Sequence, residues 1–191
     1  MKKIAIFASG NGSNFEAVAT AVQNGQINAE VALLVCDKPQ ANVITRANRL
    51  GVPTFICNPK DYPNRAAYES RVLMALQDAH VEFIALAGYM RIVGKVLLNA
   101  YGGKMVNIHP SMLPDFPGLE AIAQAYESGA TKTGVTVHYV DAGVDTGPII
   151  VQEAVDILPD DTLESLEARV HEVEHRLYVA VLKNIFEGDR K

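Results

Sequence analysis

Asn107 and His109 stand two residues apart near the end of a short apolar segment, Met-Val-Asn-Ile-His-Pro. Side chains two apart on a β-strand point to one face, and Pro110 ends the strand because it has no backbone N–H. An amide beside an imidazole suits acyl transfer: the amide donates to a developing oxyanion, and the imidazole moves a proton or stabilises charge. The alternative is a strand-end histidine bonded to the backbone, which is the better interpretation unless a carboxylate lies nearby.

A carboxylate partner is available in the acidic, glycine-rich segment 141–147, Asp-Ala-Gly-Val-Asp-Thr-Gly, which lies between two expected strands. In a sheet-based fold the tip of this loop can reach the strand end that carries Asn107 and His109. A carboxylate beside His109 would orient the ring and stabilise its charged form. Sequence separation says nothing about proximity, and a plain surface hairpin is the usual meaning of such a loop.

A second candidate site is the turn Ser-Gly-Asn-Gly-Ser-Asn, residues 9–14, between the first expected strand and the first expected helix. Its small residues permit a tight turn with exposed N–H groups, and the helix N-terminus behind it adds partial positive charge, so the turn suits an anion of phosphate size. The dinucleotide spacing G-x-G-x-x-G fails at Phe15, and no Gly-Lys-Ser/Thr follows, so we expect a monophosphate. A plain strand-to-helix turn explains these residues equally well.

The pentamer 171–175, His-Glu-Val-Glu-His, matches the H-E-x-x-H pattern of zinc peptidases on an expected helix. A zinc site of this type needs a third ligand, and the surrounding segment is dense in Glu, His and Arg, so the pattern arises easily by chance. We expect no metal here, and instead a solvated helix face with Glu174 or His175 turned toward a ligand.

These residues need a scaffold, and the pattern of apolar residues predicts one. Short apolar runs alternate with amphipathic stretches through the first hundred residues, which indicates βαβ units and a parallel sheet. In the second half, two successive strands joined by the loop 141–147 predict an antiparallel addition. We therefore expect an α/β, Rossmann-like three-layer fold with a mostly parallel central sheet. The expected strands are residues 3–8, 31–36, 54–57, 83–87, 104–108, 134–140 and 148–155, and the expected helices are residues 14–22, 41–50, 64–79, 122–126 and 163–186.

Length and composition limit the class of protein. The chain has 191 residues, of which 49% are hydrophobic and 20% charged, so we expect one globular domain over residues 1–191. Its formal net charge of −5 argues against coating nucleic acid, and its longest apolar runs are far too short to span a bilayer. We expect Cys36 and Cys57 to be buried free thiols of a cytosolic protein.

Together the motifs resemble those of the phosphoribosylglycinamide formyltransferases, a family of small folate-dependent enzymes of purine synthesis. The resemblance covers essentially the whole chain, in order. It rests on residues 9–14, on Leu-Ala-Gly-Tyr-Met-Arg-Ile at 86–92, on Asn-Ile-His-Pro-Ser at 107–111, on Val-Asp-Thr-Gly-Pro at 144–148, and on Arg169-Val170 and Glu174-His175. One such segment would be weak, but all of them at compatible spacing argue strongly against chance.

The resemblance implies a catalytic trio of Asn107, His109 and Asp145. It also implies that the primary amine of 5-phosphoribosylglycinamide attacks the formyl group of the co-substrate 10-formyltetrahydrofolate directly. The resemblance places this reaction in the synthesis of IMP and implies no metal. Residues 1–100 would hold the nucleotide and its phosphate, and residues 101–191 would supply catalysis and the folate loop. The residues implied for the ribonucleotide are Gly12, Ser13, Asn14, Phe15 and Glu174. Those implied for the folate are Arg65, Met90, Arg91, Ile92, Val93, Asn107 and Asp141.

The main alternatives are a formyltetrahydrofolate hydrolase or another formyltransferase on the same fold. Most of these carry further domains, for which we expect 191 residues to leave no room. A non-catalytic binding module would keep the phosphate turn but would not need Asn107, His109 and Asp145 together, and a zinc hydrolase would need the pentamer 171–175. We expect small-molecule substrates, no nucleic acid and no membrane as partners, a monomer or weak homodimer, and a cytoplasmic location.

Overall fold

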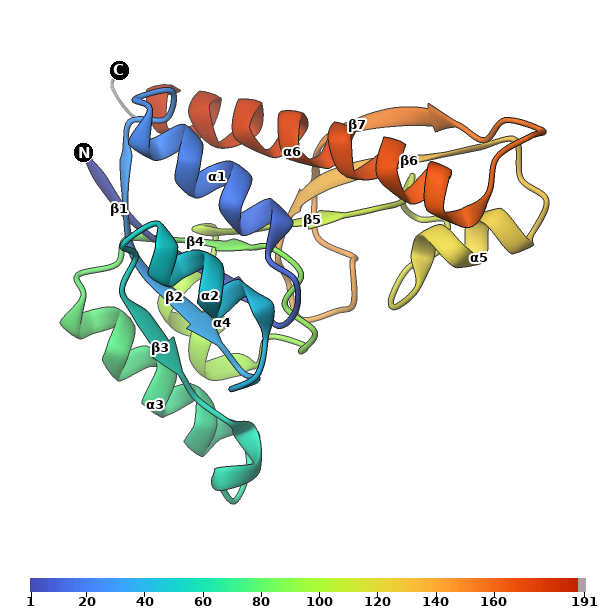
Figure 1. Cartoon of the computed structure of the whole chain (residues 1–191). Helices are drawn as coiled ribbons and strands as arrows, with labels where there is room; N and C mark the ends of the chain where they lie inside the picture. Colours follow the sequence, from blue (N-terminus) through green and yellow to red (C-terminus); the bar gives the residue numbers. More distant parts are fainter. Residues whose placement is uncertain (189–191) are drawn as a thin grey trace.

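A seven-stranded sheet in the order β3-β2-β1-β4-β5-β6-β7 forms the centre of the computed structural model, which describes residues 1–188 (Figure 1). The first five strands pair in parallel, and β6 and β7 pair antiparallel to their neighbours. This confirms the mostly parallel sheet with an antiparallel addition in the second half. The strands are β1 (Lys2–Ala8), β2 (Ala29–Cys36), β3 (Thr54–Ile56), β4 (Phe83–Leu86), β5 (Met105–His109), β6 (Lys132–Tyr139) and β7 (Ile149–Asp156).

Helices cover both faces of the sheet, so the three-layer prediction is also confirmed (Figure 1). One apolar core joins one sheet face to α1, α2, α5 and α6, and a second core joins the other face to α3 and α4. Alternation along β1 serves both cores, because Ile4 and Ile6 face the first and Ala5 and Phe7 face the second. The helices are α1 (Ser13–Gln23), α2 (Asn42–Arg49), α3 (Arg65–Asp78), α4 (Lys95–Tyr101), α5 (Ala121–Glu127) and α6 (Leu163–Gly188).

Two short elements were not predicted: the helix α4 and the 3-10 turn η1 (Pro59–Asp61). The start of α4 is fixed by a distant residue, because the buried carboxylate of Glu69 in α3 accepts the N–H of Gly94 at 2.7 Å. A Cβ at Gly94 would lie 2.7 Å from Arg65 Cδ, so glycine allows this close approach. A seven-residue helix held by such a contact has little local signal.

The long last helix begins at a reciprocal cap formed by Thr162 and Ser165. The Thr162 hydroxyl accepts the Ser165 N–H at 3.1 Å, and the Ser165 hydroxyl accepts the Thr162 N–H at 2.9 Å.

Both cysteines are free and buried as expected, with Cys36 in the core beside α1 and Cys57 in the core beside α3. No helix within residues 1–188 is both long enough and apolar enough to cross a membrane.

The strand order reverses direction at β1, which pairs with β2 on one side and with β4 on the other. Loops that follow the carboxyl ends of the two neighbouring strands diverge at such a point and leave a crevice between them. The turn 9–14 follows β1, the segment 87–93 follows β4, and His109 ends β5. The topology therefore gathers the motifs of the sequence at one edge of the sheet.

Candidate active site

A cavity of about 630 Å³ lies at these carboxyl ends and is lined by residues from both halves of the chain. Its walls include the turn 10–14, the segment 86–93, the end of β5, the loop after β6 and one face of α6. Most of the candidate site residues lie on this one cavity. Those that line it are Gly12, Ser13, Asn14, Met90, Arg91, Ile92, Val93, Asn107, His109, Asp141, Asp145 and Glu174.

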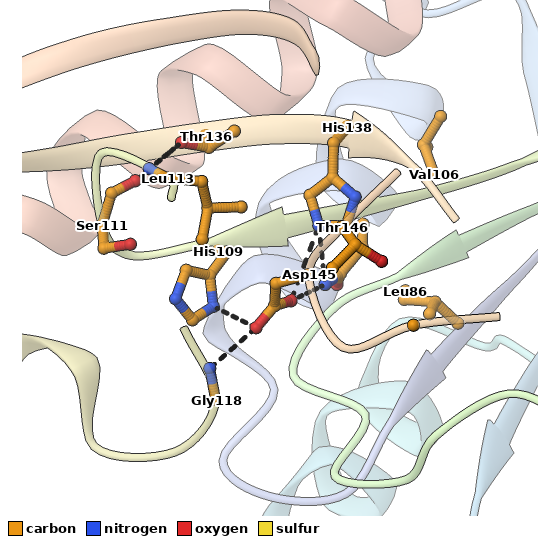
Figure 2. Close-up of polar contacts among 12 residues, drawn as sticks. Leu86, Val106, His109, Ser111, Leu113, Gly118, Thr136, His138, Asp145 and Thr146 are labelled. Carbon is orange, nitrogen blue, oxygen red and sulfur yellow. Dashed lines mark hydrogen bonds and ion pairs between the residues drawn. The ribbon is translucent and has the colours of Figure 1, made fainter. Parts of the chain in front are cut away.

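Asn107, His109 and Asp145 meet on the cavity wall, so the expected proximity of the acidic loop to the strand end is confirmed. Asn107 Nδ2 donates to Asp145 Oδ1 at 3.4 Å, and His109 Nδ1 lies 3.4 Å from Asp145 Oδ2. Figure 2 shows the carboxylate of Asp145 between His109, the Gly118 amide and a second histidine, His138 of β6. The side chains of His109 and Asp145 are only 6% and 10% exposed, so their interaction is weakly screened by solvent.

Both ring nitrogens of His109 face acceptors. Nε2 lies 2.8 Å from the carbonyl oxygen of Phe116, and Nδ1 faces the Asp145 carboxylate. A carbonyl can only accept, so Nε2 carries a proton, and a second proton on Nδ1 satisfies the contact to Asp145 as well. The surroundings of His109 therefore suit the imidazolium form, which can donate from both nitrogens.

The carboxylate of Asp145 is held in its charged form. Burial by itself raises the pKa of Asp145, but the contact to His138, the Gly118 N–H at 2.9 Å and the charge of His109 together lower it below its ordinary value. Asp145 also has a left-handed backbone with φ of 55°, a conformation that Asp tolerates better than most residues. The loop therefore presents the charged carboxylate of Asp145 to His109 and His138.

His138 is a member of this cluster that sequence reasoning missed. It lies opposite Asn107 in the β5–β6 ladder, and its Nε2 is 3.6 Å from Asp145 Oδ1. Its other nitrogen, Nδ1, donates to the carbonyl of Tyr139 at 2.7 Å, which fixes the ring. A single histidine within a mostly buried strand was the available signal, but only the strand register shows which side chain it faces.

The turn after β1 has the geometry expected of an anion site. Gly12 caps α1 with a left-handed backbone, φ 81°, and a Cβ there would lie 2.5 Å from Val43 Cγ2. Only glycine fits this position without strain. The first N–H groups of α1 have no partner inside the helix and point toward its N-terminal end, where Gly12, Ser13 and Asn14 line the cavity.

Glu174 joins α6 to this turn. Its carboxylate is buried and accepts from Asn14 Nδ2 at 3.3 Å and from His171 Nδ1 at 2.5 Å. The hydrogen bond to Glu174 is the main cause that raises the pKa of His171 above its ordinary value. His175 does not line the cavity, whereas Glu174 and its partner His171 both do, so these are the members of the pentamer that reach the site.

The segment after β4 forms a second wall, and it is tied to the turn. The N–H of Met90 donates to the Ser9 hydroxyl at 2.8 Å, and Arg91 Nε donates to the buried Asp37 carboxylate at 2.9 Å. The side chains of Met90 and Ile92 remain about half exposed, at 54% and 46%. Large apolar side chains exposed on a cavity wall suit an aromatic or apolar ligand.

The loop after β6 completes the cavity. Asp141 Oδ1 accepts from Thr146 Oγ1 at 2.7 Å and from the Gly143 N–H at 3.0 Å. The hydrogen bond from Thr146 is the main cause that lowers the pKa of Asp141 below its ordinary value. These contacts close the loop on itself and present Val144 and Asp145 to the cavity.

Two expected ligand-binding residues do not line the cavity. The side chain of Phe15 is fully buried in the core beside α6, so only its backbone N–H is available at the turn. Arg65 begins α3, and its Cδ lies against Gly94, next to the wall residue Val93.

Within residues 1–188 no three His, Cys, Asp or Glu side chains are grouped so as to hold a metal ion.

The chain was compared with known proteins by sequence and by structure. The profile of the family described as formyl transferase matches residues 2–182. The chain is 55% identical to the phosphoribosylglycinamide formyltransferase of Bacillus subtilis (strain 168), over 97% of this chain and 95% of that protein. It is also 38% identical to the human trifunctional purine biosynthetic protein adenosine-3, over 97% of this chain but only 18% of that longer protein.

Solved structures agree with the sequence matches. The structure of glycinamide ribonucleotide transformylase 1 from Geobacillus kaustophilus superimposes with a TM-score of 0.94 at 56% identity, covering 97% of this chain and 99% of that one. The phosphoribosylglycinamide formyltransferase of Bacillus halodurans gives a TM-score of 0.94 at 53% identity, with 96% and 95% covered. With sequence and fold in agreement over nearly its whole length, this chain belongs to the formyl transferase family.

Proposed function

We propose that this chain is a phosphoribosylglycinamide formyltransferase that transfers a formyl group from 10-formyltetrahydrofolate to the primary amine of 5-phosphoribosylglycinamide, in the synthesis of IMP. The observation that carries the proposal is the contact of Asn107, His109 and Asp145 on a cavity that also contains an anion-binding turn. High identity to a phosphoribosylglycinamide formyltransferase over nearly the full chain supports the same activity.

The reaction needs no protein nucleophile, because the substrate amine attacks the formyl carbon directly. The formyl oxygen then gains negative charge, and donors aimed at that oxygen lower the barrier. Asn107 Nδ2 carries two N–H groups, so one can stay on Asp145 while the other donates to the reacting oxygen. Holding both substrates in one cavity supplies much of the remaining acceleration.

In this mechanism His109 is the second donor to the oxyanion. Its Nε2–H is bonded to the carbonyl of Phe116, and it must exchange that carbonyl for the formyl oxygen when substrate binds. Asp145 holds the opposite ring nitrogen and stabilises the imidazolium charge. As the bond between the formyl carbon and the folate nitrogen breaks, the imidazolium can give a proton to that nitrogen and take one back from the attacking amine, directly or through a water molecule.

The ribonucleotide is assigned to the end of the cavity beside α1. The backbone N–H groups of Gly12, Ser13, Asn14 and Phe15 would bind its phosphate, because a helix N-terminus favours an anion. Glu174, which also contacts Asn14, would accept hydrogen bonds from hydroxyl groups of the ribose. This places the glycinamide amine on the side of the cavity that carries Asn107.

The folate is assigned to the opposite walls. Met90, Arg91, Ile92 and Val93 would pack on its aromatic rings, and Asp141 with Asn107 would orient the pterin end. Arg65, beside Val93, would meet the acidic glutamate tail. The exposed apolar side chains at 90 and 92 support this assignment, because they give an aromatic ligand a surface to cover.

The proposed division of the chain gives a nucleotide-binding half (1–100) and a half for catalysis and the folate loop (101–191), and both halves line the cavity. It has two exceptions: Arg65 and residues 90–93 of the first half also serve the folate, and Glu174 of the second half serves the ribonucleotide. We propose a cytoplasmic enzyme of small-molecule substrates that works without a metal, as a monomer or weak homodimer. Sedimentation analysis and metal analysis of the purified protein test these points.

A spectroscopic assay with 10-formyltetrahydrofolate, with and without 5-phosphoribosylglycinamide, tests the function. We expect release of tetrahydrofolate only when the ribonucleotide is present. Equal turnover without the ribonucleotide would assign the chain as a formyltetrahydrofolate hydrolase, and no turnover in either case would refute the proposal. Formylated ribonucleotide should form in equal amount with tetrahydrofolate, and mass spectrometry can quantify it.

A further inference from the structure

Two successive carbonyl groups of the turn after β1 point into α2. The oxygen of Gly10 accepts the N–H of Val43 at 3.0 Å, and the oxygen of Asn11 accepts from Arg46 Nε at 2.8 Å. In a trans peptide the carbonyl and the following N–H point in opposite directions. These two contacts therefore direct the N–H groups of Asn11 and Gly12 away from α2, into the turn that lines the cavity.

Arg46 uses all three of its guanidinium nitrogens in this arrangement. Nε bonds to the carbonyl of Asn11, Nη2 bonds to Asn11 Oδ1 at 3.2 Å, and Nη1 forms an ion pair with Glu16 in the first turn of α1. A planar, forked donor can hold a backbone carbonyl, a side-chain amide and a carboxylate at once, which a lysine cannot do. Its side chain is only 24% exposed, so this geometry is well fixed.

We propose that Arg46 is a positioning residue for the phosphate of the substrate: it touches Asn11 and Glu16, and through them it holds the N–H groups of the turn in the orientation that binds an anion. This inference rests on the proposed function, because it assumes that the turn binds the ribonucleotide phosphate. Arg46 acts through geometry more than through its charge, since that charge is neutralised by Glu16, which does not line the cavity. Asn42 assists, because its Nδ2 donates to Asn11 Oδ1 at 2.8 Å.

Arg49 provides a matched control. It lies on the same helix and pairs with the other oxygen of the Glu16 carboxylate, and within residues 1–188 its side chain bonds to Glu16 and not to the turn. Its side chain is 61% exposed. Removing Arg49 therefore removes an equal charge and a Glu16 contact, while the contacts of Asn11 stay in place.

The experiment compares Arg46→Ala and Arg49→Ala in the formyl-transfer assay. For Arg46→Ala we expect the KM for 5-phosphoribosylglycinamide to rise about tenfold, the scale of one misplaced charge-assisted hydrogen bond. Its kcat should stay within about twofold and its KM for the folate should not change, because the trio is not touched. With the unphosphorylated glycinamide riboside, the wild-type chain and Arg46→Ala should have the same kcat/KM. Arg49→Ala should match the wild type throughout.

Several outcomes would overturn the inference: an unchanged KM in Arg46→Ala, an equal rise in Arg49→Ala, or an equal loss with the riboside. Arg46→Lys keeps the charge but not the fork, so a normal KM in that variant would also contradict it. Thermal melting checks that each variant is folded, and if Arg46→Ala is not, Asn42→Ala should raise the same KM by a smaller factor. If the wild type shows no turnover, the proposed function fails, and calorimetric affinity for ribose 5-phosphate in the same variants still tests Arg46.

Discussion

His138 lies directly opposite Asn107 in the β5–β6 ladder, and both side chains reach the same oxygen of Asp145, at 3.6 Å and 3.4 Å. His109 and the Gly118 amide contact the other oxygen of that carboxylate. Asp145 is therefore surrounded by four polar partners, all supplied by the β5–β6 pair and the loop that follows β5. This arrangement makes His138 part of the electrostatic environment in which His109 works.

Replacing His138 by Gln should move the acid limb of the activity profile. The contact to His138 helps to lower the pKa of Asp145, so losing it raises that pKa and Asp145 becomes protonated at a higher pH. We expect a kcat about tenfold lower, the scale of one lost hydrogen bond, and an acid limb shifted to higher pH. Profiles of kcat against pH measure the position of the acid limb. His80→Asn is the control, because His80 is exposed. An unshifted limb would show that His138 has only a packing role.

Replacing His109 by Ala or Asp145 by Asn should each lower kcat by about 100-fold or more, the scale of a lost oxyanion donor or proton-transfer group. Because the two side chains act as one unit, the double variant should be little worse than either single one. Steady-state kinetics with both substrates saturating measure the effect. Near-normal turnover in both single variants would remove the trio from the mechanism.

Much of this site could be predicted from the sequence because its motifs are local. The apolar runs indicated all seven strands, and the carboxyl ends of parallel strands share one edge of the sheet. Asn107 and His109 could be placed on one face by alternation alone. The turn 9–14 could be located between β1 and α1, and its small residues before a helix predict an anion site, which stays a prediction.

The residues that could not be predicted make contacts across long sequence separations. Arg46 reaches Asn11 over 35 positions, and Arg91 reaches Asp37 over 54. No periodicity encodes such pairs, because they depend on how α2 and the segment after β4 pack beside the turn. His138 was missed for the same reason, since only the register of β6 on β5 places it opposite Asn107. Helix α4 was missed because the residue that holds its start, Glu69, lies in another helix.

Substituting Ser13 by Asp should weaken binding of the ribonucleotide. Ser13 is the first residue of α1 and lines the cavity, so a carboxylate there would lie beside the substrate phosphate and repel it. We expect a KM at least about tenfold higher, with the melting temperature unchanged or raised, because a negative charge suits a helix N-terminus. Ser13→Asn has the same size without the charge and is the control. Equal KM values for the two variants would mean that the phosphate binds elsewhere.

Removing Arg91 should destabilise the protein more than removing its partner. Asp37 is 1% exposed and Arg91 is 40% exposed, so Arg91→Ala leaves a buried carboxylate without its cation. Breaking a fully buried pair costs about 3 kcal/mol, and the cost here should be lower because solvent reaches the side of the pair that carries Arg91. Asp37→Asn removes the charge and should cost less, and the double variant should be more stable than Arg91→Ala alone. Urea unfolding of the three variants measures this, and a double variant that is less stable than Arg91→Ala would contradict it.

Protein stability should fall in acid as Asp161 takes up a proton. Asp161 accepts from both terminal nitrogens of Arg169, at 2.8 and 2.7 Å, and from the Leu158 N–H at 2.7 Å. The bonds from Arg169 are the main cause that holds the pKa of Asp161 well below its ordinary value. A carboxyl with a lowered pKa in the folded state stabilises the protein above its unfolded-state pKa of about 3.9, and that contribution is lost as the pH falls.

Asp161→Asn should therefore be less stable than the wild type at pH 7, and the difference should shrink as the pH falls below about 4. Urea unfolding followed by circular dichroism between pH 2.5 and 7 would measure this difference in the free energy of unfolding, and the range includes the unfolded-state pKa of about 3.9. Asp160→Asn is the matched control, because Asp160 is exposed at the neighbouring position, and it should follow the wild-type curve. A difference that stays constant with pH would mean that Asp161 stabilises the start of α6 by its shape rather than by its charge.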